Sequence, residues 1–426
     1  MDKIRVIKVF EDTPIKLNIN TQERDDILSI RDIIGDNLSL QADGRLTISH
    51  YVGFIQRNKT RVLIYPKIAR NVSNDILYNK SFDILVKMLS YTKFFEIKRI
   101  NTPQKIERYE GDVLELLIGI FIDELLFLLK KDINRSYNPI TENESFIKGK
   151  INFTENIKKN SYRKHLHYLK YEHFTENILM NQIFKSVVMN LIKKTTVNAN
   201  KMKLAQALLW LEDVDLIKLT DDIWERVTFS RLNHQYKTVF NMAKLFYHNS
   251  SINLNKGDEL SFSFLVPLNR LFERFVFELL QATINSDIYF KYQGPLSYLG
   301  HINGTMTFQL KPDISMMKRN QVLMIFDAKY KEVIDAEGNQ RILQNDIYQM
   351  LAYSVKYHCN QIALIYPKMM GSGQENLELF SVEIPKENGI LSIKVIQIDL
   401  ESGISSTINK LSQYLGLFIQ REAMLL

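Results

Sequence analysis

The sequence predicts a multidomain α+β protein, and three changes of pattern along the chain support that prediction. Residues 1–75 are rich in β-branched and aromatic runs, residues 76–255 have helical periodicity, and residues 256–426 alternate helices with strands. The chain has 426 residues, of which 45% are hydrophobic and 24% charged. It is therefore an ordered globular chain, long enough for two or three domains with cores of their own.

Strand signals dominate residues 1–75. The runs Ile4–Phe10 and Arg61–Tyr65 are mainly β-branched or aromatic, and Asp43-Gly44 is a turn signal between strand-like segments. Gly53 interrupts a strand-like run, which predicts a bulge or a close approach of another backbone. We expect a β-rich N-terminal module.

Helical spacing of apolar residues begins near residue 76 and makes the middle region mainly helical. Its longest apolar stretch, Val113–Leu129, contains three acidic residues, so we expect a buried helix and no membrane span. The polar, aperiodic segment 249–257 is the predicted linker to the last region.

Composition bounds the environment and the partners. A single cysteine, Cys359, excludes a disulfide framework and a cysteine-based zinc site, and core packing is its expected role. No apolar run of signal-peptide length begins the sequence, so we expect a cytoplasmic protein. The 55 Lys and Arg against 48 Asp and Glu give a net charge of +7, which permits phosphate-bearing partners without requiring them.

The last region has the element order α-β-β-β-α-β, which predicts a mixed sheet with helices packed against it. The final strand is apolar enough for the centre of a sheet. The expected helices are 268–285 and 344–358, and the expected strands are 287–292, 305–316, 322–330 and 361–366.

Two carboxylates and a lysine are expected to meet in this sheet. Asp313 ends the strand that contains Pro312, Asp327 follows an apolar strand, and the hairpin between them would bring both to one sheet edge. Asp327 and Lys329 are two residues apart, so both side chains share a face, while Ala328 offers its carbonyl. Phosphodiester hydrolysis needs a hard cation and an activated water, and Mg²⁺ takes one or two carboxylates. Beside a cation, Lys329 would have a lowered pKa and could orient or deprotonate the water.

An acid-x-Lys triplet recurs by chance, and Glu96-Ile97-Lys98, with Asp83 upstream, is such a case. That triplet follows a helical pattern, so its Asp83 cannot lie on a paired strand. On the helix after the hairpin, Gln349 and Tyr353 share a face. They are placed to steady Lys329 or a phosphate, and the polar edge of an ordinary amphipathic helix is an equal alternative.

Together these residues resemble the PD-(D/E)xK nuclease core of the McrC family. The resemblance is carried by Lys311-Pro312-Asp313-Ile314, by residues 325–331 and by residues 346–353. It extends upstream to segments similar to the family's N-terminal and middle parts, at 51–55, 63–68, 146–152 and 172–177. It therefore covers nearly the whole chain and implies a restriction-endonuclease-like C-terminal domain.

The resemblance implies a function and partners. McrC proteins are the nuclease subunits of McrBC modification-dependent (5-methylcytosine) restriction systems. They cleave double-stranded, modified DNA with Mg²⁺, or with Mn²⁺, when bound to McrB, a hexameric AAA+ GTPase whose hydrolysis they stimulate. The N-terminal module and the middle region would dock on that ring. GTP would be bound by the partner, since this chain has no phosphate-binding loop motif: Gly149-Lys150 is followed by Ile151.

The resemblance also implies an acid on the helix before the hairpin. We match it to Glu273, and Glu278 is the competitor, five residues away and facing a different direction. The predicted catalytic set is Asp313, Asp327, Lys329, Glu273, Gln349 and Tyr353, and the predicted metal ligands are Asp313, Asp327, Ala328 and Glu273. Two alternatives stay open: a non-catalytic activator that only holds DNA, and a stand-alone repair nuclease of the same fold.

One further segment carries a surface hypothesis. Residues 158–171 interleave basic with aromatic side chains, which is typical of a nucleic-acid or partner surface, or of a solvated basic helix edge. Within it His165 and His167 lack a third ligand at zinc spacing, so no metal site is expected there.

Overall fold

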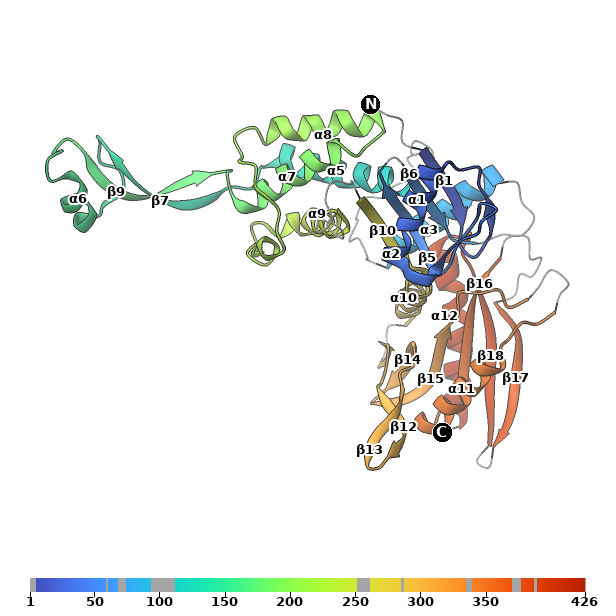
Figure 1. Ribbon diagram of the computed structural model, residues 1–426. Helices are drawn as coiled ribbons and strands as arrows, with labels where there is room; N and C mark the ends of the chain where they lie inside the picture. The colour runs from blue at the N-terminus through green and yellow to red at the C-terminus, as the bar shows by residue number, and fades with distance from the viewer. Residues whose placement is uncertain are drawn as a thin grey trace. The chain divides into compact units, whose positions relative to one another are not determined.

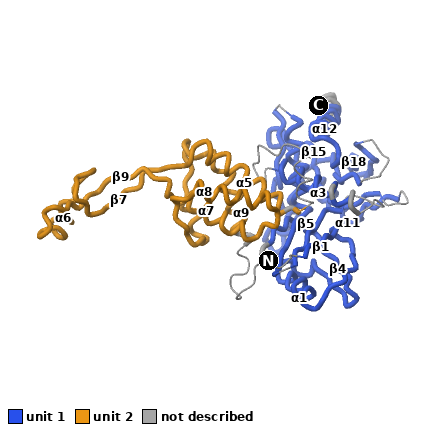
Figure 2. The backbone as a smooth tube through the Cα atoms, turned by 90° about the horizontal axis from the view of Figure 1, so that it is seen from above, with its two compact units in different colours: residues 1–111, 263–426 blue, residues 112–262 orange. Residues whose placement is uncertain are grey.

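The computed structural model describes residues 5–58, 60–67, 74–92, 112–250, 261–284, 287–334, 339–369, 377–386 and 389–425 (Figure 1). The chain forms two compact units, one of residues 1–111 and 263–426 and one of residues 112–262 (Figure 2). The second unit is thus inserted between two segments of the first. Two sequence predictions, the triplet at 96–98 and the linker beyond residue 250, lie outside the described residues.

The N-terminal part of the first unit contains the strands that the sequence predicts. Four of them form a sheet of order β1-β6-β5-β10, and three short strands form a second sheet of order β2-β4-β3. Two helices in this part were not predicted from the sequence, although a capping box between Asn20 and Glu23 marks the start of the first. The elements are β1 (Arg5–Phe10), β2 (Ile15–Lys16), α1 (Thr21–Ser29), α2 (Arg31–Ile34), η1 (Gly35–Asn37), β3 (Leu38–Leu40), β4 (Arg45–Ile48), β5 (Tyr51–Arg57), β6 (Thr60–Tyr65), α3 (Asn74–Tyr91) and β10 (Ser261–Pro267).

Gly53 lies on β5, beside the neighbouring strand β10. Its φ is +124°, and a Cβ at this position would lie 2.0 Å from the carbonyl oxygen of Phe264. The close backbone approach predicted from the sequence is confirmed. Because β10 pairs with β5, the N-terminal and C-terminal segments share one sheet, and the units differ from the three ranges that the sequence suggested.

Helices form most of the second unit. Glu115, inside the apolar stretch of α5, is buried, and its carboxylate accepts hydrogen bonds from Thr195, Thr196 and Asn200. Among the described residues, none of the helices combines the length and apolarity needed to cross a membrane. The elements are α5 (Val113–Lys131), α7 (Leu179–Ile192), α8 (Asn198–Trp210), η3 (Asp221–Trp224), η4 (His234–Tyr236) and α9 (Lys237–Ser250).

The same unit contains a ribbon that the sequence analysis missed. β7 (Ser136–Glu144) and β9 (His167–Thr175) form a long antiparallel pair, with β8 (Lys150–Ile151) and α6 (Phe153–Asn160) at its end (Figure 1). One face of β7 is exposed and the other is half-buried but mostly polar, so no alternation of apolar residues marks it. The run 158–171 therefore crosses α6, a loop and β9, and its interpretation as a helix edge is wrong beyond Asn160.

The C-terminal sheet is mixed, as predicted. Its order is β11-β14-β15-β16-β18-β17, in which β15, β16 and β18 are parallel neighbours and the other pairs are antiparallel. The apolar strand β16 lies inside the sheet, and Met350 and Tyr353 of α11 pack on one face of it. The elements are α10 (Leu268–Gln281), β11 (Ile288–Tyr292), β14 (Ile314–Lys318), β15 (Gln321–Ala328), α11 (Gln344–Tyr357), β16 (Gln361–Lys368), β17 (Glu378–Lys386), β18 (Gly389–Asp399) and α12 (Ile404–Leu425).

The single strand predicted at 305–316 is wrong. β13 (Thr305–Leu310) pairs with β12 (Ser297–Ile302) in a separate hairpin, and β14 begins only at Ile314. Pro312 lies at the break, because it has no N–H group to donate to a sheet ladder. Asp313 therefore precedes a strand and does not end one.

Replacing Gly53 with alanine should destabilise the first unit. The new Cβ would clash with the Phe264 carbonyl, and the positive φ is unfavourable for alanine, so we expect a loss of at least about 2 kcal/mol in the free energy of unfolding. Denaturant unfolding measures it. Gly416→Ala, in helix α12 with open space around the added methyl, should instead stabilise by about 0.5–1 kcal/mol. Equal effects of the two variants would contradict the close approach.

Candidate active site

Asp313 and Asp327 are brought together by the pairing of β14 with β15. The antiparallel register sets Ile314 opposite Phe326, so the two aspartates face each other at the end of the pair. Asp313 Oδ2 accepts a hydrogen bond of 2.9 Å from the backbone N–H of Ala328. The predicted meeting of the two carboxylates at one sheet edge is therefore present in the structure.

Lys329 lies beside Asp327. Its Nζ is 2.7 Å from Asp327 Oδ2, and Asp327 has no exposure to solvent. The other oxygen, Asp327 Oδ1, receives no hydrogen bond from the described residues. The ammonium compensates the charge by proximity and leaves acceptor positions of the carboxylate unfilled.

A chain of hydrogen bonds fixes Lys329 to helix α11. Lys329 Nζ donates to Gln349 Oε1 at 3.1 Å, and Gln349 Nε2 donates to the Tyr353 hydroxyl at 2.9 Å. That hydroxyl donates to the backbone carbonyl of Lys311 at 3.2 Å. Of the two interpretations of Gln349 and Tyr353, the structure favours the one in which they steady the lysine.

Of the two candidate glutamates on α10, Glu273 is connected to the site. Its Oε1 accepts a hydrogen bond of 3.0 Å from Gln293 Nε2, and Gln293 Oε1 accepts one of 2.7 Å from Lys311 Nζ. Glu278 forms a 2.6 Å ion pair with Arg274 on its own helix.

Gln293 was missed by the sequence analysis. Its backbone N–H donates to the Asp313 carbonyl at 2.6 Å, and its side chain bridges Glu273 and Lys311. The one local signal is the Gly294-Pro295 pair that follows, which marks a turn but gives no chemistry.

A second group of side chains surrounds the pair. Lys331 forms an ion pair with Asp346 at the start of α11. Tyr366 on β16 has a buried hydroxyl for which the described residues supply no hydrogen-bond partner. Burial raises the pKa of Tyr366, and the charges of Asp346 and Asp327 raise it further. Its place follows from the β15–β16 register, which puts Leu364 opposite Asp327 and Tyr366 two residues on, on the same face.

Crowding of buried acids raises their pKa values. Burial, with the charges of Asp327 and Glu273, raises the pKa of Asp313 to about 8. Burial also raises the pKa of Asp327, although Lys329 lowers it in part, and burial raises that of Glu273. Each of these three carboxyl groups therefore holds a proton to a higher pH than a carboxyl group in water does.

Lys329 behaves differently from the expectation. Burial lowers its pKa, but the Asp327 and Asp313 carboxylates outweigh burial, and the pKa is raised. The lowered pKa predicted from the sequence presupposed an adjacent cation. In the metal-free chain Lys329 is a charged hydrogen-bond donor.

The donor set suits a hard cation. Asp327 has acceptor positions without hydrogen bonds, and Asp313 lies across from it, which fits Mg²⁺ held by two carboxylates and several waters. Among the described residues, no three His, Cys, Asp or Glu side chains are grouped closely enough to hold one ion. The roles of Asp313, Asp327, Glu273 and the Ala328 carbonyl as metal ligands stay predictions.

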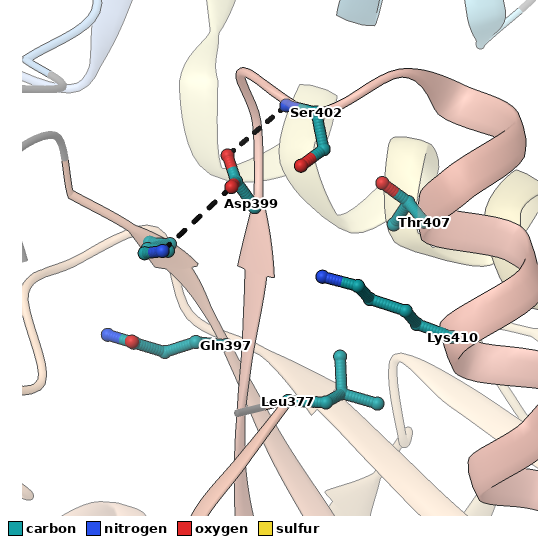
Figure 3. Close-up of a pocket in the computed structure, with 7 residues that line it drawn as sticks. Leu377, Gln397, Asp399, Ser402, Thr407 and Lys410 are labelled. Atoms are coloured by element: carbon teal, nitrogen blue, oxygen red, sulfur yellow. Dashed lines mark hydrogen bonds and ion pairs between the residues drawn. The ribbon is translucent and has the colours of Figure 1, made fainter. Parts of the chain in front are cut away.

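A separate cavity of about 500 Å³ lies at the carboxyl ends of β16 and β18 (Figure 3). None of the predicted site residues lines it. Asp399 Oδ2 lies 3.9 Å from Lys368 Nζ, so its charge compensates one of the two lysines that line the cavity. The cavity therefore offers no counterpart of the carboxylate pair. Its lining residues are Lys368, Leu377, Gln397, Asp399, Ser402, Thr407 and Lys410.

Comparison with known protein families shows which family the chain belongs to. Residues 46–367, more than half of its length, match the family described as "McrBC 5-methylcytosine restriction system component". The chain belongs to this family. The match spans β4 to β16 and so includes Asp313, Asp327 and Lys329.

Individual relatives agree with the McrBC family. The chain is 25% identical over 283 residues to the type IV methyl-directed restriction enzyme EcoKMcrBC of Escherichia coli K12, an alignment that covers 62% of this chain and 78% of that one. Its fold resembles a chain of a refined half-complex from a tetradecameric assembly of Thermococcus gammatolerans McrB AAA+ hexamers with bound McrC (TM-score 0.78, 20% identity, 97% of this chain and 100% of that one). A chain of the T. gammatolerans McrBC complex is also similar (TM-score 0.52, 20% identity, 66% and 89%).

The raised pKa of Asp313 predicts how the stability of this McrBC-family chain depends on pH. Between the ordinary value of 3.8 and about 8, the folded chain holds a proton that the unfolded chain releases. Stability without metal should therefore fall as pH rises through that window. Asp313→Asn should reduce this slope, measured as the thermal midpoint of the metal-free chain, and part of the slope should remain because burial also raises the pKa of Glu11 to about 8. Asp36→Asn, at an exposed carboxylate, should keep the slope. A slope unchanged in Asp313→Asn would contradict the burial argument.

Proposed function

We propose that this chain is the DNA endonuclease subunit of a McrBC-type restriction system and that its C-terminal sheet is a PD-(D/E)xK nuclease core. One observation carries the proposal: Asp313, Asp327 and Lys329 meet at one sheet edge, where Asp327 is fully buried with acceptor positions free of hydrogen bonds. A buried carboxylate oxygen without a hydrogen-bond partner in the chain is a position where a bound cation or water is expected.

Asp313 and Asp327 would hold Mg²⁺, or Mn²⁺ in its place. The bound cation would neutralise charge on the scissile phosphate and lower the pKa of a coordinated water. Glu273 would act in support, through the bridge that Gln293 makes to Lys311.

Lys329 would orient the attacking water and donate a hydrogen bond to a phosphate oxygen. Its raised pKa suits donation, because the ammonium stays charged near neutral pH. Gln349 and Tyr353 restrict its rotation through the hydrogen bonds described above, so the ammonium is already in place before DNA arrives. Together the three side chains supply positioning and charge at one point.

The proposed partner is a hexameric AAA+ GTPase. The similar Thermococcus chain is bound to McrB AAA+ hexamers, and family membership makes an equivalent partner the natural expectation for this chain. GTP would be bound by that partner, whose hydrolysis this chain would stimulate in the cytoplasm. The substrate would be double-stranded DNA, in keeping with the 5-methylcytosine named in the family description.

Asp327→Ala and Lys329→Ala should abolish DNA cleavage by the complex of the chain with its GTPase partner. We expect the rate to fall by at least about 100-fold, because each change removes a group from the reacting centre. Stimulation of GTP hydrolysis should remain, since neither change concerns the partner's nucleotide. Cleavage of methylated linear DNA and phosphate release from GTP measure the two activities.

The matched controls are Glu96→Ala and Lys98→Ala, which alter the same acid-x-Lys pattern elsewhere in the sequence and should leave cleavage unchanged. Loss of both activities in Asp327→Ala would indicate misfolding. If the unmodified chain binds metal but never cuts with its partner, it is a non-catalytic activator. Cutting without partner or nucleotide would make it a stand-alone nuclease.

Substitutions of the two glutamates of α10 should have different effects on Mg²⁺ binding. Glu273→Gln should weaken Mg²⁺ binding and slow cleavage about 10-fold, because it removes a negative charge that acts on Asp313. Glu278→Gln should leave Mg²⁺ affinity unchanged, since its carboxylate pairs with Arg274 on the same helix. Isothermal titration with Mg²⁺ reads out both. The reverse order of effects would exchange their assignments.

A further inference from the structure

Tyr366 lies on the strand next to the candidate active site. Its strand, β16, pairs in parallel with β15 inside the C-terminal sheet (Figure 1). The register sets Leu364 opposite Asp327. The ladder continues beyond β15 with a 2.8 Å hydrogen bond from the backbone N–H of Lys329 to the Ile365 carbonyl. Because side chains alternate along a strand, Tyr366 lies on the same face of the sheet as Asp327 and Lys329.

The ring of Tyr366 belongs to the core, but its hydroxyl has no partner in it. The side chain is fully buried and packs in the cluster that contains Met350 and Tyr353 of α11. Tyr353 and Tyr357, which packs against this cluster, each donate a hydrogen bond to a backbone carbonyl. The Tyr366 hydroxyl has no hydrogen-bond partner among the residues that the structure describes. Phenylalanine would fill the same space without burying a hydroxyl, so core packing alone does not account for this oxygen.

The hydroxyl of Tyr366 lies within reach of charged groups of the site. Asp327 pairs with Lys329, and Asp346 pairs with Lys331. Burial raises the pKa of Tyr366, and the charges of Asp346 and Asp327 raise it further. The phenol therefore stays protonated at neutral pH and has a proton to donate.

Asp327 provides an acceptor that the described residues leave unused. Its Oδ2 faces Lys329, whereas its Oδ1 is buried and receives no hydrogen bond. The donor on Tyr366 and the acceptor on Asp327 do not bond to each other directly. A molecule between them has to accept a hydrogen bond from the phenol and donate one to the carboxylate. Water does both, and buried water is typically held by polar groups of this kind.

A cation in direct contact with the phenol fits this position less well. Mg²⁺ prefers carboxylates, carbonyls and water as ligands, and it retains several waters when bound to a protein. A water that accepts one hydrogen bond from Tyr366 keeps a second lone pair, so it can also belong to that retained shell. The hydroxyl is therefore suited to a water beside Asp327 whether or not the cation is bound.

We propose that Tyr366 is a positioning residue of the candidate active site, whose hydroxyl donates a hydrogen bond to a water molecule held against Asp327 Oδ1. The effect of this contact on cleavage rests on the proposed nuclease function, whereas the water itself does not. A water held by two fixed groups keeps its orientation. It is thereby prepared for attack on a phosphate that binds beside Asp313 and Asp327.

A crystal structure of the full chain tests the contact without an assay of activity. At a resolution that shows ordered water, the metal-free chain should contain a water within about 3.2 Å of both the Tyr366 hydroxyl and Asp327 Oδ1. The same water should be lost in Tyr366→Phe. A direct hydrogen bond from Tyr366 to another side chain, or a wild-type site without this water, would overturn the proposal.

Kinetics of the complex with the GTPase partner test the consequence. Tyr366→Phe should slow the cleavage step about 10-fold, which is the usual effect of losing a group that orients the surroundings of a metal site. DNA affinity and stimulation of GTP hydrolysis should keep their wild-type values, because the buried hydroxyl contacts neither partner. The thermal midpoint of the metal-free chain should not fall, since the phenylalanine ring fills the same core space.

Tyr236→Phe is the matched control. The Tyr236 hydroxyl, in the inserted unit, donates a 2.6 Å hydrogen bond to the Asp132 carbonyl. Its loss should lower the thermal midpoint by about 2–4 °C and leave the cleavage rate unchanged. The same result in Tyr366→Phe, a lower midpoint with wild-type cleavage, would make Tyr366 an ordinary core residue and overturn the proposal. Persistent cleavage in Asp327→Ala would refute the proposed function itself, and the crystallographic water would still decide whether the contact exists.

Discussion

The arrangement of side chains at the end of β15 depends on Asp327, whose carboxylate has no access to water. An unpaired buried charge is costly, so the fold must supply a cation or a positive side chain within a few ångströms. Lys329 meets that need from two residues away, and it can do so only while the backbone after β15 stays extended. Gln349 then holds the ammonium, and core packing of Met350 and Tyr353 holds α11 in place to present Gln349. Sheet, lysine and helix thus cooperate around one buried carboxylate.

Much of this site could be predicted from the sequence because its members lie on regular elements. Strand alternation places Asp327 and Lys329 on one face, and helical spacing places Gln349 and Tyr353 on another. Pairing of β14 with β15 follows from a short turn between two apolar runs. These rules depend only on neighbouring residues, and they were sufficient to place the side chains that lie on regular strands and helices.

The remaining parts depend on contacts between distant segments. Gln293 joins Glu273 to Lys311 because β11 pairs with β14, which brings Gln293 beside Asp313, and no spacing in the sequence encodes that pairing. Whether Glu273 or Glu278 faced the site also needed the partner of each carboxylate. The ribbon of β7 and β9 was missed for another reason, since the half-buried face of β7 is mostly polar and leaves no apolar alternation to detect. Pro312 separates β13 from β14, and the sequence analysis did not predict that break.

The pairing of β10 with β5 has a consequence for how the chain is made. β5 is complete by residue 57, yet its neighbour in the sheet is translated only after the whole inserted unit, some two hundred residues later. Until then the edge of β5 offers unpaired backbone groups, which invite pairing with other nascent chains. The inserted helical unit, in contrast, can fold as soon as it leaves the ribosome. An expression fragment that stops before residue 267 would keep that open edge, so a shortened version of this protein should lose an internal part of the inserted unit and keep β10.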